Sequence, residues 1–317
     1  MKISTFNRPK SRPTFKKGAA LIAVLWLIAI LSLAAITTLR VIAFDMELVT
    51  AKVHGSRALQ LAESGIAIGC NPVVERNDPI LYRFDETNGE ETKITITSEG
   101  ARFNINTLIL AEDKSLLRSI FIYWGLDLDS AQALADAFSD WVDQDDEVAL
   151  NGAEIEEYEK MGRLNQPFNR PFYDIEEMTL VIGMEQIENL RPDWRNWFTV
   201  WSSGTLDLNE ANAELIAAAA EVQEVDASII PETVRGIDNI RDTEDDVPFQ
   251  DVASALSLLG IDAETRQDIA ARFTVDDTTT RITSTARSGD AKRRVTVIVR
   301  NRTGVPALLD RKTEIIP

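Results

Sequence analysis

The feature that most constrains this chain is an uncharged apolar run near its start. None of the residues 19–39 carries a charge. An α-helix rises about 1.5 Å per residue, so the run reaches roughly 30 Å, the thickness of a bilayer's hydrocarbon core. Six basic residues and no acid precede it, and the first acid is Asp45. This asymmetry predicts a single-pass helix with a cytoplasmic N-terminus and the bulk of the chain across the membrane.

The junction between the basic segment and the apolar run predicts a processing site. A secretory signal peptide would have a shorter apolar region that ends in small residues, whereas this run is long and ends before Arg40. The sequence Lys16-Lys17-Gly18 resembles the prepilin peptidase site of type IV pilins and type II secretion pseudopilins. A cut after Gly18 would remove residues 1–18 as a leader and leave Ala19 as the mature N-terminus. A plain signal anchor is the alternative.

Charge and inventory limit the classes of function. The 33 basic and 51 acidic residues give a net charge of -18, and removal of the six leader bases leaves 27 minus 51, or -24. Such a surface repels nucleic acid and anionic lipid. The single cysteine excludes an internal disulfide, and the single histidine nearly excludes histidine-based nucleophilic and multi-histidine zinc sites. Paired carboxylates invite a hydrolase interpretation, but no apolar cleft is indicated, so we expect no enzyme.

The order of patterns predicts an α+β fold. Helical spacing continues from Arg40 to Gly69, and Asn71-Pro72 ends it. Strands are predicted at residues 80–84 and 92–98, and a hairpin at residues 281–287 and 293–300. Residues 108–272 are mostly helical in pattern, and the tail after Gly304 has no clear element. We therefore expect a long N-terminal helix on an antiparallel sheet, with an inserted all-α domain.

Several segments resemble one family. Residues 58–66, with Ala62-Glu63 before Gly65, are similar to the segment found in minor pseudopilins and minor pilins. Further segments resemble the minor pseudopilin called protein K of type II secretion, and these are residues 140–146 (Asp-Trp-Val-Asp-Gln-Asp-Asp), 151–154 with Tyr158, 165–168, 175–178, 182–184 and 206–215. Glu210 and Asn212 stand where the family usually has Thr and Pro, so the turn there departs from the family's pattern.

The resemblance implies a function and an architecture. It implies a non-enzymatic minor pseudopilin that caps the periplasmic pseudopilus, helps to start its assembly and serves protein export across the outer membrane. The implied division is a leader (1–18), a transmembrane half-helix (19–39), a periplasmic helix with the first strands of a pilin-like domain (40–107), two SAM-like helical subdomains (108–272), and C-terminal strands with a tail (273–317). A minor pilin of a type IV pilus or a DNA-uptake pseudopilus is the alternative.

The resemblance also implies partners. These are the other minor pseudopilins at the tip, the prepilin peptidase and the inner membrane, with secreted proteins and the outer-membrane secretin as further candidates. Two segments, centred on Gly183 and Gly260, look like hairpins of helix-hairpin-helix modules. Their neighbours are acidic, so we expect no nucleic acid there. Pilin-like families usually have Glu at the fifth mature position, where this chain has Ala23.

Residues 140–159 contain nine acids and no base. Calcium prefers six to eight oxygen ligands, which clustered Asp and Glu supply, although the spacing is not that of an EF-hand. From the residues alone, a solvated acidic loop is the alternative. The resemblance implies two structural Ca²⁺ ions in the family's fold, and the candidate ligands are Asp140, Asp143, Asp145, Asp146, Glu147 and Glu154. A second cluster, with Asp238, Asp242, Glu244, Asp245 and Asp246, is expected to be a solvated loop.

Overall fold

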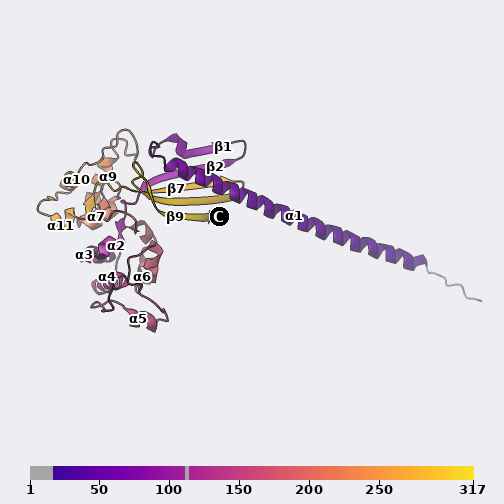
Figure 1. The fold of residues 1–317 in the computed structure, drawn as a ribbon, viewed down its shortest axis with the longest axis horizontal. Coiled ribbons are helices and arrows are strands. Elements are labelled where there is room, and N and C mark those ends of the chain that lie inside the picture. Colours follow the sequence, from indigo (N-terminus) through magenta and orange to yellow (C-terminus); the bar gives the residue numbers. More distant parts are fainter. Residues whose placement is uncertain (1–16, 111–113) are drawn as a thin grey trace, which may run out of the picture. The chain divides into compact units, whose positions relative to one another are not determined.

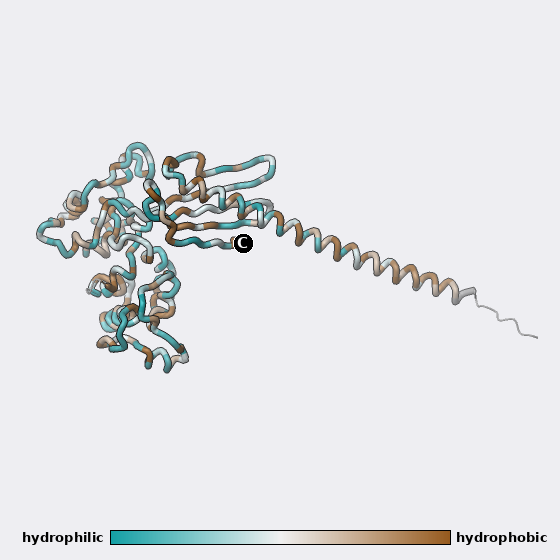
Figure 2. The backbone as a smooth tube through the Cα atoms, viewed as in Figure 1, coloured by the Kyte–Doolittle hydropathy of each residue, from teal (hydrophilic) through white to brown (hydrophobic). Residues whose placement is uncertain are grey.

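The structure is a computed structural model and describes residues 17–110 and 114–317. It divides into two units at the boundary between Arg57 and Ala58, and each is described by itself. The predicted leader lies outside the described residues except for Lys17 and Gly18, which begin helix α1 (Lys17–Gly69). In the first unit the residues of α1 from Ala20 to Val53 are exposed, and most of them are apolar, which Figure 2 shows as the brown stretches of this helix. By length and composition, α1 is able to span a membrane.

The second unit contains an antiparallel sheet with the strand order β1-β2-β7-β8-β9 (Figure 1). The strands are β1 (Tyr82–Asp85), β2 (Glu90–Ser98), β7 (Thr279–Ser288), β8 (Ala291–Arg300) and β9 (Ala307–Ile316). Buried and exposed residues alternate along β2, so one face of the sheet is covered. That face packs on residues 58–69 of α1, where Ala62 and Ile66 contact the isoleucines of β2 and β7. The α+β prediction, with a long helix on an antiparallel sheet, is confirmed.

Close packing explains the glycines at the end of α1. A Cβ at Gly65 would collide with Ser284 and Ile94, and one at Gly69 would collide with Ile282. The helix therefore approaches the sheet more closely than a side chain would allow. The guanidinium of Arg302 donates to the carbonyl oxygens of Gly69 and Asn71, at 2.6 and 2.7 Å, and so holds the end of the helix.

Two local expectations were wrong. The tail after Gly304 contains β9, which pairs with β8 at nine positions along the sheet's edge. Most side chains of β9 are exposed, so its sequence lacks the alternation that reveals a half-buried strand. The first predicted strand begins instead as a 3₁₀ turn, η1 (Pro79–Leu81), because Asp78 accepts the Ile80 N–H at 2.9 Å and Pro79 supplies no donor.

The chain between β2 and β7 forms two helical groups, which Figure 1 shows beyond one end of the sheet. The first comprises α2 (Ile105–Leu110), α3 (Ser115–Tyr123), α4 (Leu128–Val142), α5 (Ile155–Lys160), η2 (Ile175–Leu180), α6 (Met184–Leu190) and η3 (Trp194–Asn196). The second comprises α7 (Ala213–Ala220), α8 (Glu224–Ala227), α9 (Ile229–Val234), α10 (Val252–Leu258) and α11 (Gln267–Ala270). Residues of both groups contribute to one hydrophobic cluster. Within the stretch predicted to be mostly helical, residues 175–180 form a 3₁₀ helix, and the helical pattern over residues 265–272 yields only the short turn α11.

Each helical group is closed by a pair of short parallel strands. Strand β3 (Phe103–Asn104) pairs with β4 (Phe198–Thr199) around the first group, and β5 (Leu206–Asp207) pairs with β6 (Phe273–Thr274) around the second. Four of these residues are large and buried, namely Phe103, Phe198, Leu206 and Phe273. The chain therefore enters and leaves each group at adjacent points.

A buried carboxylate joins the sheet to the first helical group. Glu99 is fully buried, pairs with Arg281 of β7 and accepts the hydroxyl of Thr199. Arg102 adds a second guanidinium at 3.3 Å. Burial raises the pKa of Glu99, but the two arginines and the hydrogen bonds outweigh it, so its pKa lies below the ordinary value. The charge is thus paired and hydrogen-bonded, as a buried charge must be.

Candidate functional site

The strongest candidate site is the acidic loop of the first helical group, residues 140–154. Helix α4 ends at Val142 and leaves Asp140 buried in its last turn, with Asp143 as the C-cap. The chain returns so that Glu154, which is only 3% exposed, begins α5. The structure thus brings together Asp140, Asp143 and Glu154.

These three carboxyl groups repel one another. Burial, followed by the charge of Asp140, raises the pKa of Asp143 to about 6. Burial, followed by the charges of Asp140 and Asp143, raises the pKa of Glu154 to about 7. Burial also raises the pKa of Asp140. Raised carboxyl pKa values of this kind mean that the ionised loop lacks enough compensating positive charge.

Several oxygens of the loop are buried without a partner. The Oδ1 atom of Asp143 and both carboxylate oxygens of Glu154 have no hydrogen-bond partner among the described residues. Asp140 is better satisfied, since its two oxygens accept the Ala149 N–H at 3.2 and 3.4 Å. The loop also lies tightly over Asp140, because a side chain at Gly152 would collide with its carboxylate. A buried oxygen without a hydrogen-bond partner is costly, so these carboxylates are the least stabilised part of the loop.

The other three predicted ligands lie at the rim. Asp145, Asp146 and Glu147 are exposed. Asp145 accepts the Glu147 N–H at 2.9 Å, which shapes the turn. Among residues 17–110 and 114–317, no group of three or more His, Cys, Asp or Glu side chains is arranged to hold a metal ion. The buried donors are carboxylate oxygens, which is the type of ligand that calcium prefers.

The uncharged residue of this site, Asn169, was not identified from the sequence. The amide of Asn169 donates to the Asp145 carbonyl at 3.2 Å, and its own Oδ1 is buried without a partner among the described residues. Asn169 is thus a further candidate oxygen ligand. An amide carries no charge, so its presence beside an acidic loop gives no compositional signal. Its position directly after residues 165–168, which resemble the family, was the available hint.

An aromatic floor fixes the loop. Trp141 is fully buried and stacks on Phe172, with ring centroids 6.0 Å apart and planes 5° apart. Tyr158 meets it edge-on at 5.6 Å, and Phe168 lies at 5.0 Å. Because Trp141 is flanked in sequence by Asp140 and Asp143, its packing sets the place of both carboxylates. The tryptophan of the Asp-Trp-Val-Asp segment is therefore structural.

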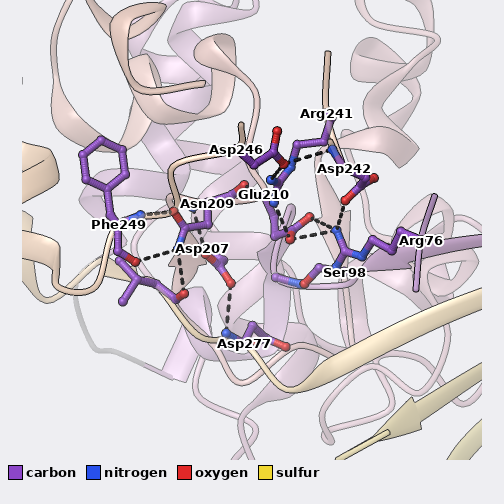
Figure 3. A network of polar contacts seen from close by, with 12 residues as sticks. Arg76, Ser98, Asp207, Asn209, Glu210, Arg241, Asp242, Asp246, Phe249 and Asp277 are labelled. Atoms are coloured by element: carbon purple, nitrogen blue, oxygen red, sulfur yellow. Dashed lines mark hydrogen bonds and ion pairs between the residues drawn. The ribbon is translucent and has the colours of Figure 1, made fainter. Parts of the chain in front are cut away.

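The second acidic cluster differs from expectation, because three of its five acids are half-buried and bonded, and Figure 3 shows two of them, Asp242 and Asp246. Arg76 pairs with Glu210 at 2.8 Å and faces Asp242 at 3.8 Å. Arg241 pairs with Glu210 at 3.1 Å and also with Asp246. The carboxylate of Asp245 accepts the N–H groups of Ile237 and Asp238, at 2.6 and 3.0 Å. Only Asp238 and Glu244 of this cluster have exposed side chains.

In the hairpin-like segment at Gly183, the backbone amide of the glycine hydrogen-bonds within the chain. Gly183 has a φ of 95° and begins α6, and its N–H donates to the Glu185 carboxylate at 3.1 Å. In a phosphate-binding hairpin such an amide faces the ligand. Here an acid of the same chain occupies the amide, which agrees with the charge argument against nucleic acid.

Comparison with known proteins gives three findings. The family model described as "Type II secretion system (T2SS), protein K" matches residues 101–192, a range that includes the acidic loop and its aromatic floor. A type II secretion system protein K from Dickeya chrysanthemi is 34% identical over 70 residues, which is 22% of this chain and 19% of that protein. The matched part therefore spans about a fifth of the relative's length.

The third finding concerns the fold. The crystal structure of the GspK-GspI-GspJ complex from the enterotoxigenic Escherichia coli type 2 secretion system contains a chain that matches with a TM-score of 0.60 and 18% identity. The match covers 86% of this chain and 98% of that one. Residues 101–192 are therefore similar in sequence to protein K of the type II secretion system, and the chain has the fold of the E. coli chain.

Proposed function

We propose that this chain is a minor pseudopilin of the type II secretion system, a non-enzymatic subunit that assembles with other minor pseudopilins. The observation that carries the proposal is the combination of an apolar α1, a sheet packed on its last turns, and a large helical insertion between β2 and β7. The E. coli chain of similar fold was crystallised in a complex with GspI and GspJ. Subunits of that kind are the partners that we propose here.

Processing is part of the proposal. A prepilin peptidase would cut between Gly18 and Ala19, where the basic segment meets the apolar helix. The basic leader favours a cytoplasmic N-terminus, which places the sheet and helical groups in the periplasm and α1 in the inner membrane. N-terminal sequencing of the membrane-extracted chain should begin at Ala19. A start at Met1, or beyond Leu39, would contradict this part of the proposal.

We place the subunit at the tip of the pseudopilus. Pilin-like subunits usually carry a Glu at the fifth mature position, which neutralises the terminal amine of the subunit above. Ala23 offers no such charge, and an unpaired amine at membrane depth costs about 2.5 kcal/mol or more. A subunit without that Glu is tolerated where no subunit stands above it. The helical insertion adds bulk to the periplasmic part, which also suits an end position.

Two experiments test the tip position. Immunogold labelling of assembled fibres should place the chain at one end, and label along the shaft would overturn the assignment. Ala23→Glu should leave assembly and secretion unchanged, because no partner amine requires the new carboxylate. Loss of secretion in cells that lack the chain, restored by the wild-type chain, tests the secretion role itself. Lost pilus motility or DNA uptake with normal secretion would instead favour the pilin alternative.

We also propose that the acidic loop binds a structural calcium ion. Asp140, Asp143 and Glu154 would hold the ion from the buried side, and Asp145, Asp146 and Glu147 would supply oxygens from the rim. The unpartnered oxygens of Asp143 and Glu154 support this proposal, because a bound cation would satisfy them and remove the mutual repulsion. A bound calcium ion would supply only charge and coordination. Its ligand residues would fix the loop against the aromatic floor.

A further inference from the structure

The outward face of the sheet has a charge opposite to that of the chain. Residues 58–69 of α1 cover one face, and the other borders a hollow of about 740 Å³. Two acids line this hollow, Glu91 and Glu314. Five bases line it, namely Lys93, Arg281, Arg287, Lys292 and Arg294. We call the four bases other than Arg281 the cationic sheet face, because Arg281 is neutralised by the buried Glu99.

Strand register creates this face. Lys93 of β2 and Arg294 of β8 stand on either side of Thr285 of β7. One step along the sheet, Arg287 lies directly opposite Lys292. Like charges directly opposite one another destabilise a sheet, so folding alone gives no reason for this arrangement. The same strands could carry neutral residues at these outward positions.

The acids of the face do not balance it. Glu91 approaches Arg287 at 3.5 Å, and Glu314 approaches Arg294 at 3.8 Å while it also faces Lys312. Lys93 and Lys292 have no carboxylate partner among the described residues. Four bases thus face two acids. In a chain with a net charge of -18, this local excess of positive charge would attract an acidic partner at short range.

Hydroxyl groups lie beside the bases. Thr95, Thr283 and Thr296 stand in one row across β2, β7 and β8, and the last two hydroxyls are 3.4 Å apart. Such a row can donate to carboxylates and accept from backbone N–H groups. A second hollow, of about 260 Å³, runs between this face and the first helical group and shares Arg281, Thr296 and Glu314 with the first. The second hollow also contains the acids Asp174, Glu176 and Asp310, so the polar and cationic groove is the first hollow.

We propose that this groove binds an extended acidic segment of a partner protein. The bases match its carboxylates, and the threonines match its backbone and side-chain polar groups. A bilayer fits the site less well, because it is hollowed and, apart from Ala286 and Ile316, its lining offers polar side chains instead of groups that insert into lipid. Nucleic acid is disfavoured by the large negative charge of the whole chain. This inference does not depend on the proposed role in secretion.

The test measures binding of a fluorescein-labelled polyglutamate peptide to the full chain in nonionic detergent at low salt. Fluorescence anisotropy should show binding that weakens about tenfold in the variant Lys93→Gln/Lys292→Gln/Arg294→Gln, since charge complementarity is lost. A matched control, Arg83→Gln/Lys160→Gln/Arg235→Gln, removes the same charge elsewhere and should keep the wild-type affinity. Equal weakening in both variants, or no binding by the wild type, would overturn the proposal.

Two further measurements separate the alternatives. The variant Lys93→Arg/Lys292→Arg keeps both charges and should bind the peptide as the wild type does, whereas a merely structural role for these lysines would not predict rescue. Circular dichroism should show the same strand content in all variants. Vesicles of phosphatidylglycerol and phosphatidylethanolamine should neither bind through these residues nor displace the peptide. Vesicle binding that is lost in the first triple variant would identify a lipid surface and refute the acidic segment.

Discussion

The two helical groups each carry an acidic loop, and the two loops solve the same electrostatic problem differently. In the loop of the second group, residues 236–247, the guanidinium of Arg76 faces Asp242 and that of Arg241 pairs with Asp246. In the first group, residues 140–154, Lys114 is the base whose charge reaches Asp140 and Asp143, and it is already paired with Asp136 at 3.2 Å. The comparison teaches that acidic composition alone does not distinguish a loop whose carboxylates are neutralised by arginines from one whose carboxylates are not.

The largest expected effect comes from the floor of the first loop. Trp141→Ala should lower the free energy of unfolding by about 3–5 kcal/mol, because a fully buried tryptophan leaves a large cavity. It should also abolish any response of the loop to calcium, while the second loop keeps its bonds. Tyr173→Ala, at a side chain that is 65% exposed, is the control and should cost little. A loss for Trp141→Ala as small as the control's would contradict the floor's role.

The next largest effect is stabilisation by calcium, which should depend on the first loop and not on the second. At a calcium concentration about a hundred times the Kd, an ion that binds only the folded chain adds about 2.7 kcal/mol of stability. The thermal midpoint of the full chain should therefore rise with calcium and fall with chelator. Asp143→Ala/Asp145→Ala should remove this gain, whereas Asp238→Ala/Glu244→Ala in the second loop should retain it. Identical melting curves with calcium and with chelator would leave the first loop a solvated one.

Loss of an arginine should make the second loop resemble the first. Arg241→Gln leaves Glu210 and Asp246 without one cationic partner, at a cost on the order of 1–3 kcal/mol. Chemical unfolding of the full chain would measure it. Arg235→Gln removes a base nearby that has no ion pair among the described residues, and it should be nearly neutral. Equal effects of the two substitutions would mean that net charge, and not the network, stabilises this loop.

The smallest expected effect is the contribution of the first loop to the pH dependence of stability, measured in chelator. A carboxyl whose pKa is raised to about 7, as for Glu154, holds its proton more tightly in the folded chain than in the unfolded chain. Its stabilising contribution is complete below the ordinary value of 4.5 and is lost as the pH rises through about 7. Glu154→Gln should flatten the stability profile across that range. A profile as steep as that of the wild type would assign the dependence to other groups.

Sequence patterns predicted the parts of the fold that bury one regular face. The apolar run of α1, the alternation in β2 and the β7–β8 hairpin all carry strong periodic signals. Strand β9 was not predicted, because an edge strand with few buried residues has no such periodic signal. The short turn α11 was predicted as a longer helix, since propensity does not fix where packing ends a helix.

The candidate site was predicted in part for a similar reason. Charge density located the acidic segment, and Asp140, Asp143 and Glu154 do meet in the structure. Sequence could not say that Asp145, Asp146 and Glu147 would lie at the rim, because burial depends on how the loop folds over Trp141. Arg76 and Glu210 lie 134 positions apart, so the sequence could not show that they pair. The neutralisation of the second loop by arginines was therefore not predicted.

The adjacency of the two strands from which the helical groups emerge has an evolutionary consequence. Ser98 at the end of β2 pairs with Thr280 at the start of β7, so the chain leaves the sheet and returns to it at neighbouring points. In topological terms, everything between them is one lengthened hairpin connection. A simpler ancestral sheet could have acquired this insertion at a surface turn without changing a single strand pairing, as surface turns commonly tolerate inserted domains. Replacement of the insertion by a tight turn would then recreate the smaller ancestor.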